Sequence, residues 1–131
     1  MSTQQQKPLV LILARAFASN LSTPTLLTDA NGRLVFFNEA AEVVIGRRFS
    51  EVGEVPLDDW LAGFEPRTST GEPLPPERLP SQIALDARRP AHLQYTVTSA
   101  DRVERVIEVS AFPLFAHADE FMGVIVIFWR P

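Results

Sequence analysis

Few side chains in this 131-residue chain have the types and spacing for acid–base or nucleophilic chemistry. Asp58 and Asp59 form a carboxylate pair, but neighbouring positions on a helix point about 100° apart. Acidic residues in a first helical turn also stabilise the helix dipole, which explains this pair without catalysis. Ser110 has no His or other general base beside it in a recognisable motif. Tyr95 is the single tyrosine, which gives little support to an isomerase site built from an acid and a phenol. We therefore expect no catalytic residues and no enzymatic activity.

The composition restricts metal and cofactor chemistry further. There is no cysteine, which excludes disulfides, thiolate nucleophiles, iron–sulfur clusters and cysteine-based zinc sites. The two histidines, His92 and His117, are too few for a multi-histidine metal site. The net charge of -4 provides no electrostatic footprint for nucleic acid. The apolar run from Leu9 to Ala14 is far shorter than the ~20 residues of a membrane span, and it is also short for a signal peptide. We expect a cytoplasmic protein with no metal, no nucleic-acid partner and no membrane partner.

The elements that would position a site are clearest between residues 28 and 46. Asn31-Gly32 is typical of a two-residue type I′ hairpin turn, because both residues accept positive φ. Asn38 ends the second strand of this hairpin and is predicted to cap a two-turn helix, which Gly46 ends. As a simple cap, Asn38→Ala is expected to cost about 1 kcal/mol and Asn38→Asp much less.

Period-two alternation predicts which strand residues share a face. In the hairpin, it places Val35 and Phe37 on one face, and Leu34 and Phe36 on the opposite face together with Leu27. Further along the chain, short helices are predicted over residues 56–64 and from Pro80, with a proline-rich loop over 65–76 between them, followed by strands over 91–97, 103–115 and 121–129. The last of these strands is apolar on both faces, so its outer side must also be covered.

Residues 8–21 predict an amphipathic helix that covers this outer side. Pro8 suits a first helical position, and Arg15 is predicted to lie away from the apolar face. That face is formed by Val10, Leu13, Ala14, Phe17 and Leu21.

Three phrases carry a family resemblance: LLTDANGRLVFFNEAAEVVIG, GEPLPPERLPSQIAL and RVIEVSAFPLFAHADEFMGVIVIF. They resemble the PAS domain family over about residues 22 to 129. The resemblance implies an α+β fold with a five-stranded antiparallel sheet in the order 2-1-5-4-3, short helices on one face and the N-terminal helix on the other. Residues 1–22 would form that helix and residues 23–131 the PAS domain. The motif's structural positions are Asp29, Gly32, Asn38 and Gly46.

The chain departs from the family near Pro131, where relatives often continue through an Asp-Ile-Thr into a signalling helix. We interpret this departure as favouring a free-standing protein. The other interpretation is the sensor fragment of a larger kinase or transcription regulator.

The resemblance also implies a ligand pocket between the sheet and the short helices. Its predicted lining comprises Leu26, Phe37, Ala41 and Ile45, with Trp60, Phe64, Ile83 and Tyr95 as further candidates. These side chains are nearly all apolar, which favours a fatty acid-like or other small apolar ligand. A flavin photocycle needs a cysteine, and haem-binding relatives usually use a His from the region of residues 76–89, which has none, while in some relatives a His at a strand start, where His92 lies, can ligate haem. We therefore expect no haem and no flavin, with His92 a solvated residue at a strand start. A filled core with no ligand is the alternative.

Two classes of function follow from the resemblance. The first is a sensory and signal-transduction module that acts in trans on a signalling protein, including in regulation of transcription. The second is a constitutive interaction or dimerisation module without a ligand. Both include a homodimer, because the N-terminal helix has more apolar side chains than one sheet face can bury. The predicted dimer interface comprises Leu9, Val10, Ile12, Leu13, Phe17 and Leu21.

Overall fold

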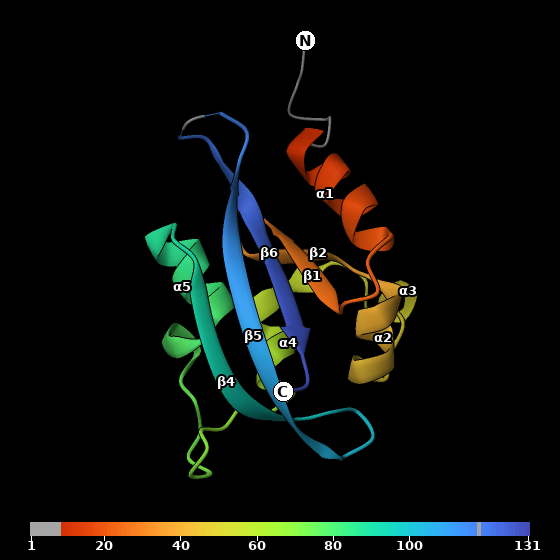
Figure 1. Ribbon diagram of the computed structural model, residues 1–131, viewed down its shortest axis with the longest axis vertical. Helices are drawn as coiled ribbons and strands as arrows, with labels where there is room; N and C mark the ends of the chain where they lie inside the picture. Colours follow the sequence, from red (N-terminus) through yellow and green to blue (C-terminus); the bar gives the residue numbers. More distant parts are fainter. Residues whose placement is uncertain (1–8, 118) are drawn as a thin grey trace.

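A computed structural model describes residues 9–117 and 119–131. Its centre is one antiparallel sheet in the order β3-β2-β1-β6-β5-β4 (Figure 1). The strands are β1 (Thr25–Asp29), β2 (Arg33–Phe37), β3 (Val55–Pro56), β4 (Ala91–Thr98), β5 (Glu104–Phe115) and β6 (Phe121–Trp129). The predicted α+β fold and strand order are confirmed, and the two-residue β3 adds a short edge strand that the alternation was too brief to indicate.

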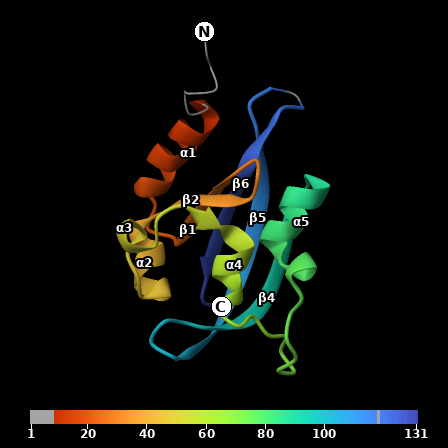
Figure 2. The ribbon, with the colours of Figure 1, turned by 180° about the vertical axis from the view of Figure 1, so that it is seen from behind.

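Helices lie on both faces of this sheet. They are α1 (Leu9–Ser19), α2 (Glu39–Ile45), α3 (Phe49–Val52), α4 (Leu57–Ala62) and α5 (Pro80–Ala87), with a 3₁₀ turn η2 at Pro76–Arg78. The helix α1 packs against β1 and β6 on the outer face, whereas α4 and α5 lie on the inner face, which is turned toward the viewer in Figure 2. The buried core lies between the inner face and these short helices. Within the described residues, no helix is both long enough and apolar enough to cross a membrane.

The β1–β2 hairpin does not use the predicted type I′ turn. Such a turn needs positive φ at two central residues, but Gly32 has φ 81° while Asn31 does not have a positive φ. Instead, the Asp29 side chain accepts hydrogen bonds from the backbone N–H of Asn31 at 2.9 Å and of Arg33 at 3.0 Å. The Gly32 N–H also donates to the Asp29 carbonyl at 3.1 Å. Asp29 therefore stabilises a three-residue turn. Only the last residue of this turn has the positive φ that favours glycine.

A β-bulge changes which residues of β2 face the core. Leu27 pairs with Phe36 and Thr28 with Leu34, so Val35 is the extra residue. An extra residue reverses the alternation beyond it. As a result, Leu34 and Phe37 are both buried, at 0% and 1% exposure. The expectation that Leu34 shares a face with Phe36 is wrong for this reason.

Asn38 connects three elements through its side chain. Its Oδ1 accepts from the backbone N–H of Ala41, at 3.0 Å, which confirms the predicted cap of α2, and from that of Thr25 at 3.0 Å. Its Nδ2 donates to the carbonyls of Ala18 and Thr23 at 2.9 Å and of Leu21 at 3.4 Å. Asn38 therefore joins the end of α1, the start of β1 and the start of α2. The predicted C-terminal stop is also present, because Gly46 has φ 84° in the left-handed region.

The helix α1 uses a different face from the one predicted. Leu11 and Ala18 are buried against the sheet, while Leu13 and Phe17 are 59% and 61% exposed. Arg15, predicted to point away, instead lies with its guanidinium 4.5 Å from the centre of the Phe36 ring. The predicted first position, Pro8, lies outside the described residues.

Candidate functional site

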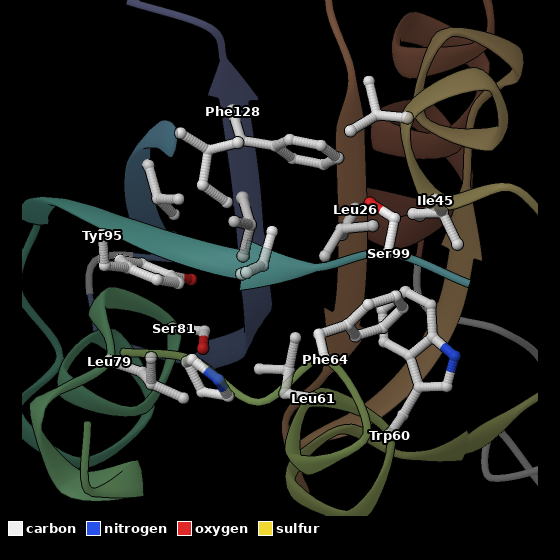
Figure 3. A pocket seen from close by; sticks show the side chains of 16 residues that line it. Leu26, Ile45, Trp60, Leu61, Phe64, Leu79, Ser81, Tyr95, Ser99 and Phe128 are labelled. Carbon is white, nitrogen blue, oxygen red and sulfur yellow. The ribbon is translucent and has the colours of Figure 1, made fainter. Parts of the chain in front are cut away.

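A pocket of about 60 Å³ lies between the inner face of the sheet and the helices α2 and α4 (Figure 3). Strands β1, β4, β5 and β6 provide its floor, and the segment before α5 closes one side. The lining side chains are Leu26, Val44, Ile45, Trp60, Leu61, Phe64, Pro66, Leu79, Ser81, Tyr95, Val97, Ser99, Ile107, Val109, Val126 and Phe128. The lining contains no Asp, Glu, Lys, Arg or His.

Five of the eight predicted pocket residues are in this lining, namely Leu26, Ile45, Trp60, Phe64 and Tyr95. The other three lie elsewhere. Phe37 is buried behind the lining and stacks on Trp60, with ring centres 5.5 Å apart, and Ala41 is fully buried in the core. Ile83 is half-buried on α5 and does not contribute to the lining. The structure thus locates these residues, and their binding of a ligand stays a prediction.

Several lining residues were not predicted. Two residues of β5, Ile107 and Val109, and two of β6, Val126 and Phe128, face the pocket. Period-two alternation along each strand indicates this inward position. Ser81 and Ser99 gave no such signal, because serine is usually a surface residue. Only the packing of α5 and the end of β4 against the core reveals that both are buried.

The lining includes three side-chain hydroxyls, those of Ser81, Ser99 and Tyr95. Ser81, Ser99 and Tyr95 are only 5%, 4% and 7% exposed. None of these hydroxyls makes a side-chain hydrogen bond within the described residues, and none is fully enclosed there, because Gln82 Oε1 is the one fully buried side-chain polar atom without a partner. Burial raises the pKa of the Tyr95 phenol well above its usual value, so this group stays a neutral donor and acceptor. The site therefore combines apolar walls with neutral hydrogen-bonding groups that the protein itself leaves unused.

A series of ring contacts connects the pocket to α1. Trp60 lies edge-on to Phe64 at 4.9 Å and stacks on Phe37 at 5.5 Å. Phe37 and Phe36 each contact Phe49 edge-on, at 5.3 and 5.7 Å between ring centres. The guanidinium of Arg15 on α1 then covers Phe36. Side chains from β2, α3 and α4 thus form one contiguous path between the pocket wall and the outer helix.

A second polar cluster lies on the outer face of the sheet. His92 Nδ1 is 2.7 Å from Ser110 Oγ, and His92 Nε2 is 2.8 Å from Glu108 Oε2. The expectation that Ser110 has no neighbouring base is therefore wrong, because the register of β4 and β5 pairs it directly with His92. The His92 side chain is 51% exposed on the open sheet surface, and it lies beside the Trp129 ring at 5.9 Å. This cluster lies on an open surface that does not enclose a substrate, so we propose no catalytic role for it.

The described residues do not form a metal-binding group. No three His, Cys, Asp or Glu side chains there are placed to hold an ion together. His117 contacts Glu120 at 3.5 Å in an exposed turn.

Comparisons with known proteins identify the fold. The sequence profile of the family described as PAS fold matches residues 18–130, whereas no curated protein matches the chain. Among solved structures, the PAS domain of BvgS from Bordetella pertussis is 17% identical, with a TM-score of 0.64 over 92% of this chain and 84% of that chain. The PAS domain of nitrogen regulation protein NR(II) from Vibrio parahaemolyticus is 18% identical, with a TM-score of 0.63 and coverage of 91% and 98%.

The fungal blue-light photoreceptor Vivid, in its light-state dimer, is 13% identical, with a TM-score of 0.63 and coverage of 85% and 79%. At such identities the solved structures establish the fold alone, while the sequence profile establishes the family. This chain belongs to the PAS-fold family.

Proposed function

We propose that this protein is a non-catalytic sensory and signal-transduction module that binds a small, largely apolar molecule in the pocket beneath the sheet. PAS domains are generally non-catalytic sensory modules. The observation that carries the proposal is the pocket itself, where apolar walls surround the hydroxyls of three buried residues, none of which makes a side-chain hydrogen bond within the described residues. Hydroxyls that line a cavity without a protein partner remain available as donors and acceptors, so the arrangement favours an occupant that hydrogen-bonds to them.

The size of the pocket narrows the ligand. An engineered apolar cavity that binds benzene has a volume of about 150 Å³, whereas this pocket has about 60 Å³. A fatty acid would therefore need Leu61 and Phe64 to move aside. A small molecule needs no such rearrangement and is the ligand that we favour. We expect neither haem nor flavin, since both are far larger than the pocket.

We also propose a class of protein partner and a cellular location for this module. The sensory module would act in trans on a signalling protein in the cytoplasm, such as a kinase or a transcription regulator. Support comes from structural neighbours whose names include a nitrogen regulation protein and a blue-light photoreceptor. The alternative is a constitutive interaction module in which the pocket has no ligand.

Native mass spectrometry of the full-length protein tests this proposal. We expect a fraction of the protein to retain a small organic molecule after gentle purification, or to gain one when incubated with a metabolite extract. A protein that has only the bare polypeptide mass under both conditions would favour the constitutive module. Absorption spectra of the same sample should show no haem or flavin band.

A second candidate function, homodimerisation, rests on the exposed side of α1. Leu9, Leu13 and Phe17 recur every fourth residue, so they form one stripe along the helix, and they are 59–68% exposed, with Ile12 beside them at 47%. The predicted interface residues Val10 and Leu21 are half-buried against the sheet instead. A second copy of this chain offers a matching stripe, and twofold pairing buries both. We therefore propose a homodimer through the stripe formed by Leu9, Ile12, Leu13 and Phe17.

A further inference from the structure

The hydroxyls of the pocket are distributed unevenly, and their positions restrict where a ligand can form hydrogen bonds. Tyr95 and Ser81 lie on the same side of the pocket, whereas Ser99 lies toward Leu26 and Ile45 (Figure 3). The wall between these two polar positions is apolar. A molecule that occupies the pocket therefore meets two hydroxyls together at the Tyr95 and Ser81 end, and mostly hydrocarbon along the rest of its length.

We propose that the pocket selects short, uncharged molecules with a single hydrogen-bonding group, such as short-chain alcohols or ketones, which Tyr95 and Ser81 bind through their hydroxyls. This inference rests on the proposed function, because it assigns a chemical class to the same pocket.

The absence of charge in the lining supports the restriction to neutral ligands. Burying a carboxylate or an ammonium group without an opposite charge is strongly unfavourable, and none of the lining residues is acidic, basic or a histidine. The Tyr95 phenol is neutral, so it offers one O–H donor and an acceptor oxygen. An alcohol or ketone oxygen matches such groups without a desolvated charge.

The volume supports the restriction to short ligands. A cavity of about 150 Å³ binds the six carbons of benzene, and in proportion this pocket encloses roughly two to three non-hydrogen atoms. Leu61 and Phe64 are only half-buried, so they form an edge over which a short apolar tail can extend. Water is the competing occupant, but a buried water needs two to four polar partners. Tyr95 and Ser81 provide the minimum of two at one end of the pocket, so an alcohol must displace a weakly held water, and its hydrocarbon tail favours this by covering the apolar wall.

Titrations followed by ¹H–¹⁵N NMR on the full chain test the ligand class. The probes are 1-propanol, propionate as the charged molecule of equal carbon number, and xenon as a purely apolar atom. We expect 1-propanol to shift the backbone signals of pocket residues such as Val97 and Ser99 with saturation, and equal concentrations of propionate to leave them unchanged. Tyr95→Phe and Ser81→Ala should each raise the Kd for 1-propanol by roughly two- to tenfold, the effect of one lost hydrogen bond. Xenon binding should be unchanged in Tyr95→Phe, which retains the ring.

The contrary results distinguish a wrong ligand class from a failure of the proposed ligand-binding function. If xenon binds but 1-propanol does not, or if propionate binds as well as 1-propanol, the pocket exists but the ligand class is wrong. The same conclusion holds if both variants bind 1-propanol as tightly as the original protein. If neither xenon nor 1-propanol shifts the pocket signals, the ligand-binding function itself is overturned. Asn31→Ala, at an exposed turn residue, is the matched control for non-specific effects of the alcohol.

Discussion

At the scale of single residues, Asn38 shows how one amide can hold several elements together. As a cap alone, it would need only an acceptor oxygen, and aspartate would replace it well. The structure adds a donor role, because its Nδ2 lies opposite three backbone carbonyls, those of Ala18, Leu21 and Thr23. A carboxylate at this position would place an oxygen against those carbonyls and leave them without a donor. The sequence-based expectation that Asn38→Asp costs little therefore needs revision.

We predict that Asn38→Ala lowers the free energy of unfolding by roughly 2–4 kcal/mol, because a cap and several buried hydrogen bonds are lost together. Asn38→Asp should also be strongly destabilising. Urea denaturation followed by tryptophan fluorescence measures both, with Asn31→Ala as the control at an exposed asparagine. An aspartate variant as stable as the original protein would show that the donor bonds contribute nothing.

The Tyr95 phenol gives a second prediction at this scale, which concerns pH. Burial raises its pKa in the folded protein, whereas in the unfolded chain it ionises near its usual value of about 10. The unfolded state therefore loses the proton first, so the stability contribution is complete below about pH 10 and is lost as pH rises above that value. Since Tyr95 is the only tyrosine, phenolate absorbance at 295 nm reports it directly. The free energy of unfolding of Tyr95→Phe should fall less steeply as pH rises. A folded protein whose tyrosine titrates near pH 10 would contradict the prediction.

Single residues also show how far the sequence allowed prediction. The Asn38 cap, the Gly46 stop and the inward position of Tyr95 follow from local rules, and the structure places all three as expected. The pairing of His92 with Ser110 does not follow from local rules, because it depends on the register between two strands. No motif within either strand specifies that register.

At the scale of elements, the predictions were accurate where periodicity is regular and wrong where one residue interrupts it. The helices after Asn38 and from Pro80 and the three long strands begin and end close to the predicted positions. The bulge at Val35 reverses the alternation in β2, and no residue in that strand signals it. The inner face of α1 was also misassigned, because the larger apolar residues suggested a core face. The buried residues of α1 are instead Leu11 and Ala18.

The contact between α1 and β2 yields a prediction for these elements. Arg15 covers the Phe36 ring, and exposed cation–π contacts of this kind are worth about 0.5–1 kcal/mol. We predict that Arg15→Gln destabilises the protein by about that amount, and that most of the loss disappears when Phe36 has already been replaced by Leu, since the Phe49 ring is farther from the guanidinium, at 5.9 Å. A double-mutant cycle measured by urea denaturation tests the coupling. Arg89→Gln, which changes an exposed arginine after α5, is the matched control, and additive effects at Arg15 and Phe36 would contradict the prediction.

At the scale of the whole molecule, the outer face of the sheet is only partly covered. The helix α1 lies over β1 and β6, while Val106, Phe112 and Trp129 remain 39–44% exposed on β5 and β6. The register of β5 and β6 places these three side chains on one face of the sheet. Together with the α1 stripe, they give this side of the molecule more exposed apolar surface than the inner side, where short helices enclose the core. Large apolar patches on a folded protein commonly mark interaction sites.

The final prediction concerns the oligomeric state that this surface implies. Full-length protein should have about twice the monomer mass of 14.6 kDa in light scattering at micromolar concentration. Leu13→Asp places a charge at the centre of the α1 stripe, where dimerisation would have to bury it without a partner, so we expect a folded monomer. Removing the whole helix would be a poorer test, because Ala18 and Leu11 also bury against the sheet and Asn38 would lose its bond to the Ala18 carbonyl. Val43→Asp is the matched control, since Val43 is 78% exposed on α2, outside the stripe, and it should leave the dimer intact. A full-length protein that remains monomeric at high micromolar concentration would refute the dimer. The helix α1 would then be an intramolecular cover of β1 and β6, and the outer strands β4 and β5 would be the surface left for a partner.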